Sequence, residues 1–267
     1  MEPVGTLHAC LGLSTVAHGH IEAMDLSAVE AAPGVCWVMT AADIPGVNDI
    51  SPNGLHDDPI FATETVEFWG QPLFAVVAQT RELARRAARL AKVRYRKLPH
   101  ALDIESATAA GHPYVTAPLT LQRGEVDTAL AGAPHRLAGR MVVGGQDHFY
   151  LEGQIALAVP GEDAEVTVHV STQHPSEVQH MVSHALGVPA NAVTVSVRRM
   201  GGGFGGKETQ MNLFACVAAI AAKRLKCAVK LRPDRDDDMV ATGKRHDFAI
   251  DYAVCLLYTS DAADERP

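Results

Sequence analysis

The residues best suited to chemistry lie in a glycine-rich segment at positions 200–208, which reads MGGGFGGKE. Five glycines surround one aromatic residue, Phe204, and Lys207 and Glu208 follow directly. Because glycine has no Cβ atom, the backbone N–H groups of such a loop can approach a ligand closely. Three kinds of ligand could use it: a dinucleotide, a nucleoside triphosphate, or an oxo-metal or pterin cofactor.

A dinucleotide is the first possibility, because Gly201, Gly203 and Gly206 satisfy the pattern G-x-G-x-x-G. That fingerprint also needs an acidic residue about 20 residues further on, at the end of the next strand. The first acidic residue after Glu208 is Asp234, which comes later than the pattern requires. A nucleotide-binding module therefore stays open as an alternative, on a weak motif.

A triphosphate is the second possibility, since Gly201 and Gly206-Lys207 satisfy G-x-x-x-x-G-K. The Ser or Thr that should bind magnesium is replaced by Glu208, whose charge would repel phosphates. In the third possibility the loop holds an oxo-metal or pterin cofactor and Glu208 faces a substrate. The residues alone leave open whether Glu208 does this or only starts a helix, where the dipole favours an acid.

The elements around the loop predict an α/β (α+β) fold. Residues 165–171 alternate as a strand, and Pro175 opens a helix that Gly187 ends. A strand at 194–198 leads into the glycine loop. A helix at 208–225 is apolar nearly all round and should be buried, and a strand at 228–231 follows. This order places the loop at the carboxyl end of a strand, where α/β proteins usually bind ligands.

The N-terminal block has its own elements. Strands are expected at 34–40, 73–79 and 93–96, with a helix capped by Thr80 between the last two, as a strand–helix–strand unit. Residues rich in Ala, Gly, Pro and Thr then suggest a linker. The expected division is a first domain at 1–105, a linker at 106–130, a second domain at 131–254 and a separate tail at 255–267.

Composition argues against several kinds of partner and site. The 267 residues carry a net charge of −8, which disfavours nucleic acid as a partner. Five cysteines form no Cys-x-x-Cys pair, so zinc and iron–sulfur signatures are missing, and a reducing cytoplasm is expected. The longest apolar run, 214–222, is too short to span a membrane.

Four motifs occur in order along the chain. They are 144–152 (GGQDHFYLE), 171–177 (STQHPSE), 198–208 (RRMGGGFGGKE) and 234–240 (DRDDDMV) with 243–246 (GKRH). Together they resemble the molybdenum-binding subunit of bacterial xanthine dehydrogenases, in the xanthine oxidase family, over roughly residues 5–254. The resemblance implies an N-terminal a/b hammerhead domain followed by part of the first molybdopterin-binding domain.

The resemblance also assigns roles to residues. Gln173 matches a glutamine that approaches an oxygen ligand of molybdenum, and Phe204 matches a residue whose backbone amide reaches the metal centre. Gly203 and Gly205 flank Phe204 in the cofactor-binding loop. Glu208 matches a glutamate that hydrogen-bonds a purine ring, where the related aldehyde oxidases usually have an apolar residue. Residues 146–152 are expected to line the cofactor region without chemistry of their own.

The implied activity is the hydroxylation of hypoxanthine and xanthine to urate in purine catabolism. The implied electron path runs through Fe–S clusters and FAD to NAD, with those centres on a partner subunit of a hetero-oligomer. An aldehyde oxidase or another azaheterocycle hydroxylase is the alternative within the family. No catalytic residue is expected here, because the family's general-base glutamate and substrate arginine have no match in this chain. The chain is thus expected to be an inactive N-terminal fragment, with a non-native tail after Val254.

Overall fold

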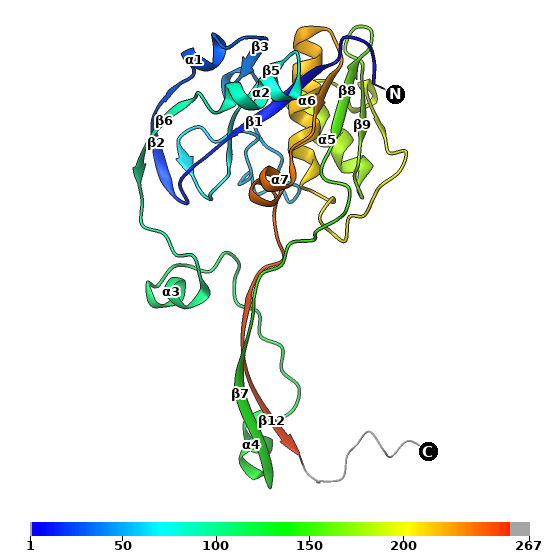
Figure 1. The fold of residues 1–267 in the computed structure, drawn as a ribbon. Helices are drawn as coiled ribbons and strands as arrows, with labels where there is room; N and C mark the ends of the chain where they lie inside the picture. The colour runs from blue at the N-terminus through cyan, green and yellow to red at the C-terminus, as the bar shows by residue number, and fades with distance from the viewer. Residues whose placement is uncertain (1, 257–267) are drawn as a thin grey trace. The chain divides into compact units, whose positions relative to one another are not determined.

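The computed structural model describes residues 2–256, which form two compact units (Figure 1). One unit comprises the chain up to Pro99 together with Asp147–Lys244, and the other comprises His100–Gln146 and the described residues from Arg245 onward. Among the described residues, no helix combines the length and apolar character needed to cross a bilayer. The protein is a mixed α/β chain, as the sequence predicts.

The first unit is built on a mixed seven-stranded sheet whose buried strands are rich in alanine and valine. β5 is buried at every position, in keeping with the continuous apolar run of its sequence. In sheet order the strands are β10 (Val193–Ser196), β9 (Val166–Val170), β8 (Ala156–Pro160), β11 (Val229–Leu231), β1 (Leu7–Leu13), β5 (Pro72–Ala78) and β3 (Val35–Met39).

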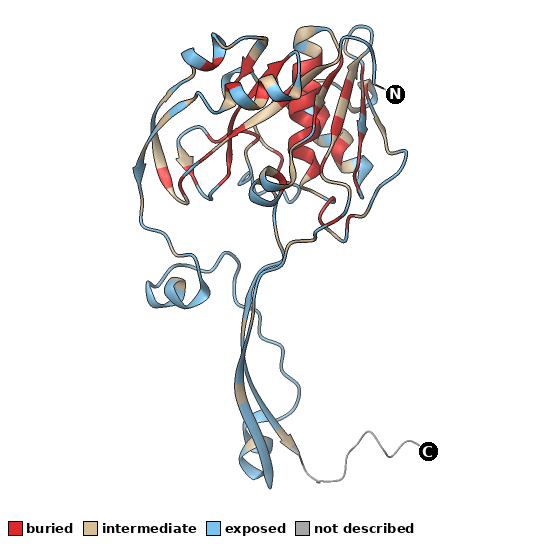
Figure 2. Cartoon of the chain, viewed as in Figure 1, coloured by how far each residue is buried: buried red, intermediate tan, exposed pale blue. Residues whose placement is uncertain are grey.

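Helices α5 and α6 pack on this sheet and on each other, and they enclose the main core (Figure 2). Every residue of α6 from Met211 to Ala222 is buried, so the predicted buried helix is confirmed. The helices of this unit are α1 (Ser27–Glu30), α2 (Arg81–Ala88), α5 (Pro175–Leu186), α6 (Met211–Leu225) and α7 (Arg235–Ala241), with 3-10 turns at Ala41–Asp43 and Ala190–Ala192.

The local signals read from the sequence are confirmed at both ends of helices. The Thr80 side chain accepts the N–H of Leu83 and caps α2, Pro175 opens α5, and Gly187 ends it in the left-handed conformation. The expected strand–helix–strand unit is confirmed as β5, α2 and β6, although its two strands lie in different sheets. β6 belongs to a separate three-stranded sheet of β4 (Thr65–Val66), β2 (Gly19–Asp25) and β6 (Lys92–Lys97).

The second unit is a two-stranded antiparallel ribbon with two short helices. Its elements are α3 (Ile104–Ala109), α4 (Val126–Gly132), β7 (His135–Val143) and β12 (Phe248–Leu256). Helices α3 and α4 occupy the two ends of the predicted linker, and β12 continues through Cys255 and Leu256 although a break after Val254 was expected. The rest of the predicted tail lies outside the described residues, and the domain boundaries remain predictions.

Candidate functional site

The glycine loop connects β10 to α6 and follows an unusual backbone path. Phe204 has φ 54° and Gly205 has φ 85°, which places both in the left-handed region. A bulky residue such as Phe204 rarely adopts this conformation unless its surroundings enforce it. The turn extends to Gln210, so α6 begins at Met211 and the predicted helix start at 208 is wrong. Glu208 therefore lies before the helix rather than in its first turn.

Gln173 holds the centre of this loop. It follows β9, precedes α5 and is exposed at the sheet edge, as expected. Its Oε1 atom accepts the N–H groups of Gly205, at 3.0 Å, and Lys207, at 3.3 Å. Its own backbone N–H donates to the Lys207 carbonyl at 2.8 Å. The side-chain NH2 group of Gln173 has no acceptor among residues 2–256.

Gly203 makes this close approach of Gln173 possible. A Cβ atom at Gly203 would lie 2.4 Å from Gln173 Oε1, a distance that no side chain could accept without a shift. Gly203 is buried, so the space is closed by the amide rather than by solvent. The glycine at this position is therefore explained by the contact that fixes Gln173.

Phe204 contributes its backbone rather than its ring. The residue is 75 % exposed, and its backbone N–H has no acceptor within the part of the chain that the structure describes. The free N–H of Phe204 and the free NH2 of Gln173 thus belong to one loop assembly and both can donate. Fixed donors of this kind suit the oxo ligands of a metal centre, so these residues fit an oxo-metal cofactor.

An ion pair between a buried lysine and a partly exposed glutamate supports the loop. Lys207 is fully buried, and its Nζ lies 3.3 Å from Glu152 Oε2 and donates to Ser171 Oγ at 2.9 Å. The Tyr150 ring lies 4.7 Å from the same ammonium. This placement argues against a P-loop, in which the lysine reaches the phosphates. Burial lowers the pKa of the Lys207 ammonium, although the Glu152 charge opposes this.

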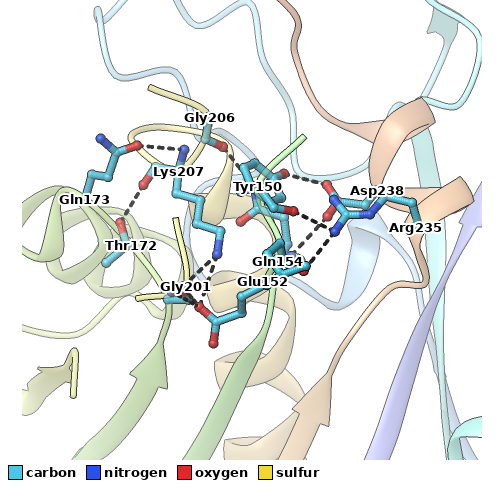
Figure 3. A network of polar contacts seen from close by, with 12 residues as sticks. Tyr150, Glu152, Gln154, Thr172, Gln173, Gly201, Gly206, Lys207, Arg235 and Asp238 are labelled. Atoms are coloured by element: carbon cyan, nitrogen blue, oxygen red, sulfur yellow. Dashed lines mark hydrogen bonds and ion pairs between the residues drawn. The ribbon is translucent and has the colours of Figure 1, made fainter. Parts of the chain in front are cut away.

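A second polar cluster lies beside the ion pair (Figure 3). The Tyr150 hydroxyl donates to Asp238 Oδ1 at 2.7 Å, and Gln154 Nε2 donates to that hydroxyl at 2.8 Å and to the Gly206 carbonyl at 2.9 Å. Arg235 donates to the Tyr150 carbonyl at 2.7 Å. Burial and the contact with Asp238 raise the pKa of Tyr150, which keeps its hydroxyl protonated as a donor.

The four sequence motifs therefore contribute residues to one hydrogen-bonded network. It brings Gln173, Gly203 and Gly205 together, whereas Glu208 is exposed and makes no hydrogen bond or ion pair among the described residues. The structural residues at 150, 152 and 154 were missed as loop anchors. No local signal marked them, because residues 150–154 form no strand and their partners, such as Asp238 and Gly206, lie far away in the sequence.

Comparisons with known proteins address the same segments. The family of the molybdopterin cofactor-binding domain matches residues 109–257. This chain belongs to that family. The a/b hammerhead domain of aldehyde oxidase and xanthine dehydrogenase matches residues 1–99. The glycine loop and Gln173 both lie within the part of the chain that matches the cofactor-binding domain.

Individual relatives of this molybdopterin-binding chain are longer proteins. Xanthine dehydrogenase of Oryza sativa subsp. japonica is 42 % identical over 255 residues, which cover 94 % of this chain and 19 % of the relative. Xanthine dehydrogenase of Dictyostelium discoideum is 40 % identical over 249 residues, which cover 93 % of this chain and 18 % of the relative. The chain spans about a fifth of the length of these curated relatives.

Solved structures agree on the fold. Quinoline 2-oxidoreductase from Pseudomonas putida 86 superposes with a TM-score of 0.83 at 24 % identity, covering 96 % of this chain and 34 % of that one. Aldehyde oxidoreductase from Desulfovibrio gigas gives a TM-score of 0.82 at 26 % identity, covering 95 % of this chain and 29 % of that one.

Proposed function

We propose that this chain is the cofactor-binding region of a molybdenum hydroxylase of the xanthine dehydrogenase type. The observation that carries the proposal is the pair of unused donors, the Phe204 backbone N–H and the Gln173 NH2 group. The Gln173 NH2 group and the Phe204 N–H would hold the oxo end of the cofactor by hydrogen bonds, and Gly203 and Gly205 would shape the loop that presents these donors. When bound, the cofactor supplies the two-electron redox chemistry, while these residues bind and orient it.

The substrate that we propose is a purine, with hypoxanthine and xanthine converted to urate. Glu208 is exposed, has no partner in the described chain, and directly follows the loop, so its carboxylate is available to accept hydrogen bonds from ring N–H groups. The named xanthine dehydrogenases among the relatives support this choice. An aldehyde oxidase or another azaheterocycle hydroxylase is the alternative, which the aldehyde oxidoreductase and quinoline 2-oxidoreductase structures support.

Further parts of the enzyme would lie outside this chain. We assign the general base and a substrate arginine to other regions of the whole protein, because no residue here matches them. Fe–S and FAD centres that pass electrons to NAD would belong to a partner subunit or to other domains. A cytoplasmic, bacterial setting completes the proposal.

The substrate assignment is tested by Glu208→Val in a full-length parent enzyme. The substitution removes the charged carboxylate that would accept a hydrogen bond from the purine ring, so kcat/KM for the purine should fall by roughly 10- to 100-fold. Turnover of an aldehyde should be retained or rise. Glu162→Val, at another exposed glutamate, is the control and should change neither. Equal loss on both substrates would contradict a purine-specific role. Xanthine oxidation by the isolated 267-residue chain would contradict the assignment of the base elsewhere.

A further inference from the structure

Both ends of the glycine loop meet at one carboxylate oxygen. Glu152 Oε2 accepts the N–H of Gly201, where the loop begins, at 2.7 Å. The same oxygen lies 3.3 Å from Nζ of Lys207, where the loop ends. The Glu152 backbone N–H also donates to the Gly201 carbonyl at 3.2 Å, so the first glycine is held from two sides. One side chain thus closes the loop into a ring.

The lysine at the end of this loop cannot leave the carboxylate without a large cost. Lys207 is fully buried, and its Nζ forms an ion pair with Glu152 at 3.3 Å. The more distant Asp238 charge also favours the ammonium, and Ser171 and the Tyr150 ring are further partners. A buried ammonium that loses its counterion is strongly destabilised. The pair therefore keeps the loop ends together even though Glu152 is 40 % exposed at its side chain.

One free donor, the Phe204 N–H, lies within this ring, and the other belongs to Gln173, which is bound to the ring. Phe204 is between Gly201 and Lys207, and Gln173 binds the N–H groups of Gly205 and Lys207. A shift of either loop end would move both the Phe204 N–H and the oxygen contact that orients Gln173. We propose that Glu152, together with Lys207, is the positioning residue that fixes these two donors at the cofactor. This deepens, and rests on, the proposed function.

The hydrogen bond between Glu152 and the Gly201 N–H should depend on whether the Glu152 carboxylate is ionised. Burial alone would raise the pKa of Glu152, but the Gly201 N–H, the Ser171 hydroxyl and the Lys207 ammonium together hold the pKa below its ordinary value of 4.5. A lowered pKa means that the charged contact is present above pH 4.5 and is lost as the pH falls through the lower folded value. The Gly201 amide should therefore titrate below pH 4.5 in nuclear magnetic resonance spectra.

The test uses the purified 267-residue chain and the variants Glu152→Gln, Lys207→Met and the double variant. Glu152→Gln should abolish the acid titration of the Gly201 amide and speed its hydrogen exchange about 10- to 100-fold, as expected when a charged hydrogen bond is lost. Amides of β9 and α6 should keep their exchange rates. Glu82→Gln is the matched control, because it removes an exposed ion pair with Arg86 on α2 and should leave the loop unchanged.

The double variant keeps the test decisive if Glu152→Gln does not fold, because it leaves no unpaired buried ammonium. Unchanged loop exchange in the folded double variant, or an unchanged Gly201 titration in folded Glu152→Gln, overturns the proposal. In the cofactor-loaded full-length parent, Glu152→Gln should also shift the molybdenum electron paramagnetic resonance spectrum. Faster hydrogen exchange in the loop with an unshifted spectrum would show that Glu152 holds the loop but does not position the donors at the cofactor. If the full-length wild-type parent bound no molybdenum, the proposed function itself would be contradicted.

Discussion

The geometry of the glycine loop depends on the absence of a single atom, the Cβ of residue 203. Alanine at this position would place Cβ 2.4 Å from Gln173 Oε1, so either the loop or the amide must move. Gln173 would then lose its hold on Gly205. The orientation of the Gln173 side chain, with its free NH2 group, therefore depends on glycine at position 203.

Gly203→Ala should accordingly lower the free energy of unfolding by about 1 kcal/mol, because the Gln173 side chain can move aside only by giving up its hydrogen bonds to the loop. It should also reduce the molybdenum content of a full-length parent. Urea unfolding and metal analysis measure the two effects. Gly132→Ala is the control, since nothing lies within 4 Å of its added Cβ. A Gly203→Ala variant with wild-type stability and metal content would show that the loop tolerates the shift.

The sequence indicated Gln173, Phe204 and Glu208 because each belongs to a recognisable motif. It did not indicate the contact between Glu152 and Lys207, because long-range side-chain pairing leaves no local pattern. The expectation that residues 146–152 have no chemistry of their own is untested, but Glu152 has a structural contact that motif reading could not supply. Burial of the Lys207 ammonium was likewise invisible, because lysine is usually exposed.

At the scale of elements, the helix ends follow local chemistry. Thr80 has an extended backbone and its side chain accepts the N–H of Leu83, which satisfies one of the donors that α2 leaves open. Gly187 ends α5 at φ 66°, a conformation that glycine adopts without strain. Such signals depend on residues within one turn of each other, so the sequence located these ends correctly.

Thr80→Ala should therefore destabilise the protein by about 1 kcal/mol through loss of this cap. The change is expected as a lower urea midpoint with an unchanged slope, since the surface exposed on unfolding stays the same. Thr120→Ala, at an exposed position outside any helix or strand, is the comparison and should have no measurable effect. A cap variant as stable as this comparison would mean that α2 is held by its packing alone.

The start of α6 shows where prediction from local sequence fails. Residues 208–210 are compatible with helix, yet the turn that closes the glycine loop continues through them and α6 starts at Met211. Contacts from Gln173 to Lys207 fix this turn from another part of the chain. Tertiary structure thus overrides helix propensity at the one boundary that matters for Glu208.

At the scale of the whole chain, the two regions that match separate families share one sheet. β1 from the hammerhead match pairs in parallel with β11 from the cofactor-binding match, with Leu7 opposite Val229. Sequence periodicity identifies strands but not their partners, so a consecutive domain order was the natural expectation. The compact units, by contrast, combine segments that are distant in sequence.

Residues 1–99 and 109–257, produced separately, should therefore fail to fold cooperatively. Each half would expose a sheet edge, β1 in one and β11 in the other, together with part of the main core. Circular dichroism melting and dye binding should show an uncooperative transition and exposed apolar surface for each half. Mixing or co-expressing the halves should restore a sharp transition. Sharp unfolding of the 1–99 piece alone would show that its strands need no partner.

The pairing of β1 with β11 also has a consequence for synthesis on the ribosome. Leu7 is made about 220 residues before its partner Val229. At roughly 5–20 residues per second, β1 must wait on the order of 10–45 s before one of its two neighbours exists. Its edge, bearing unpaired N–H and C=O groups, is exposed during that time, so the nascent chain should need protection by chaperones that the finished sheet does not.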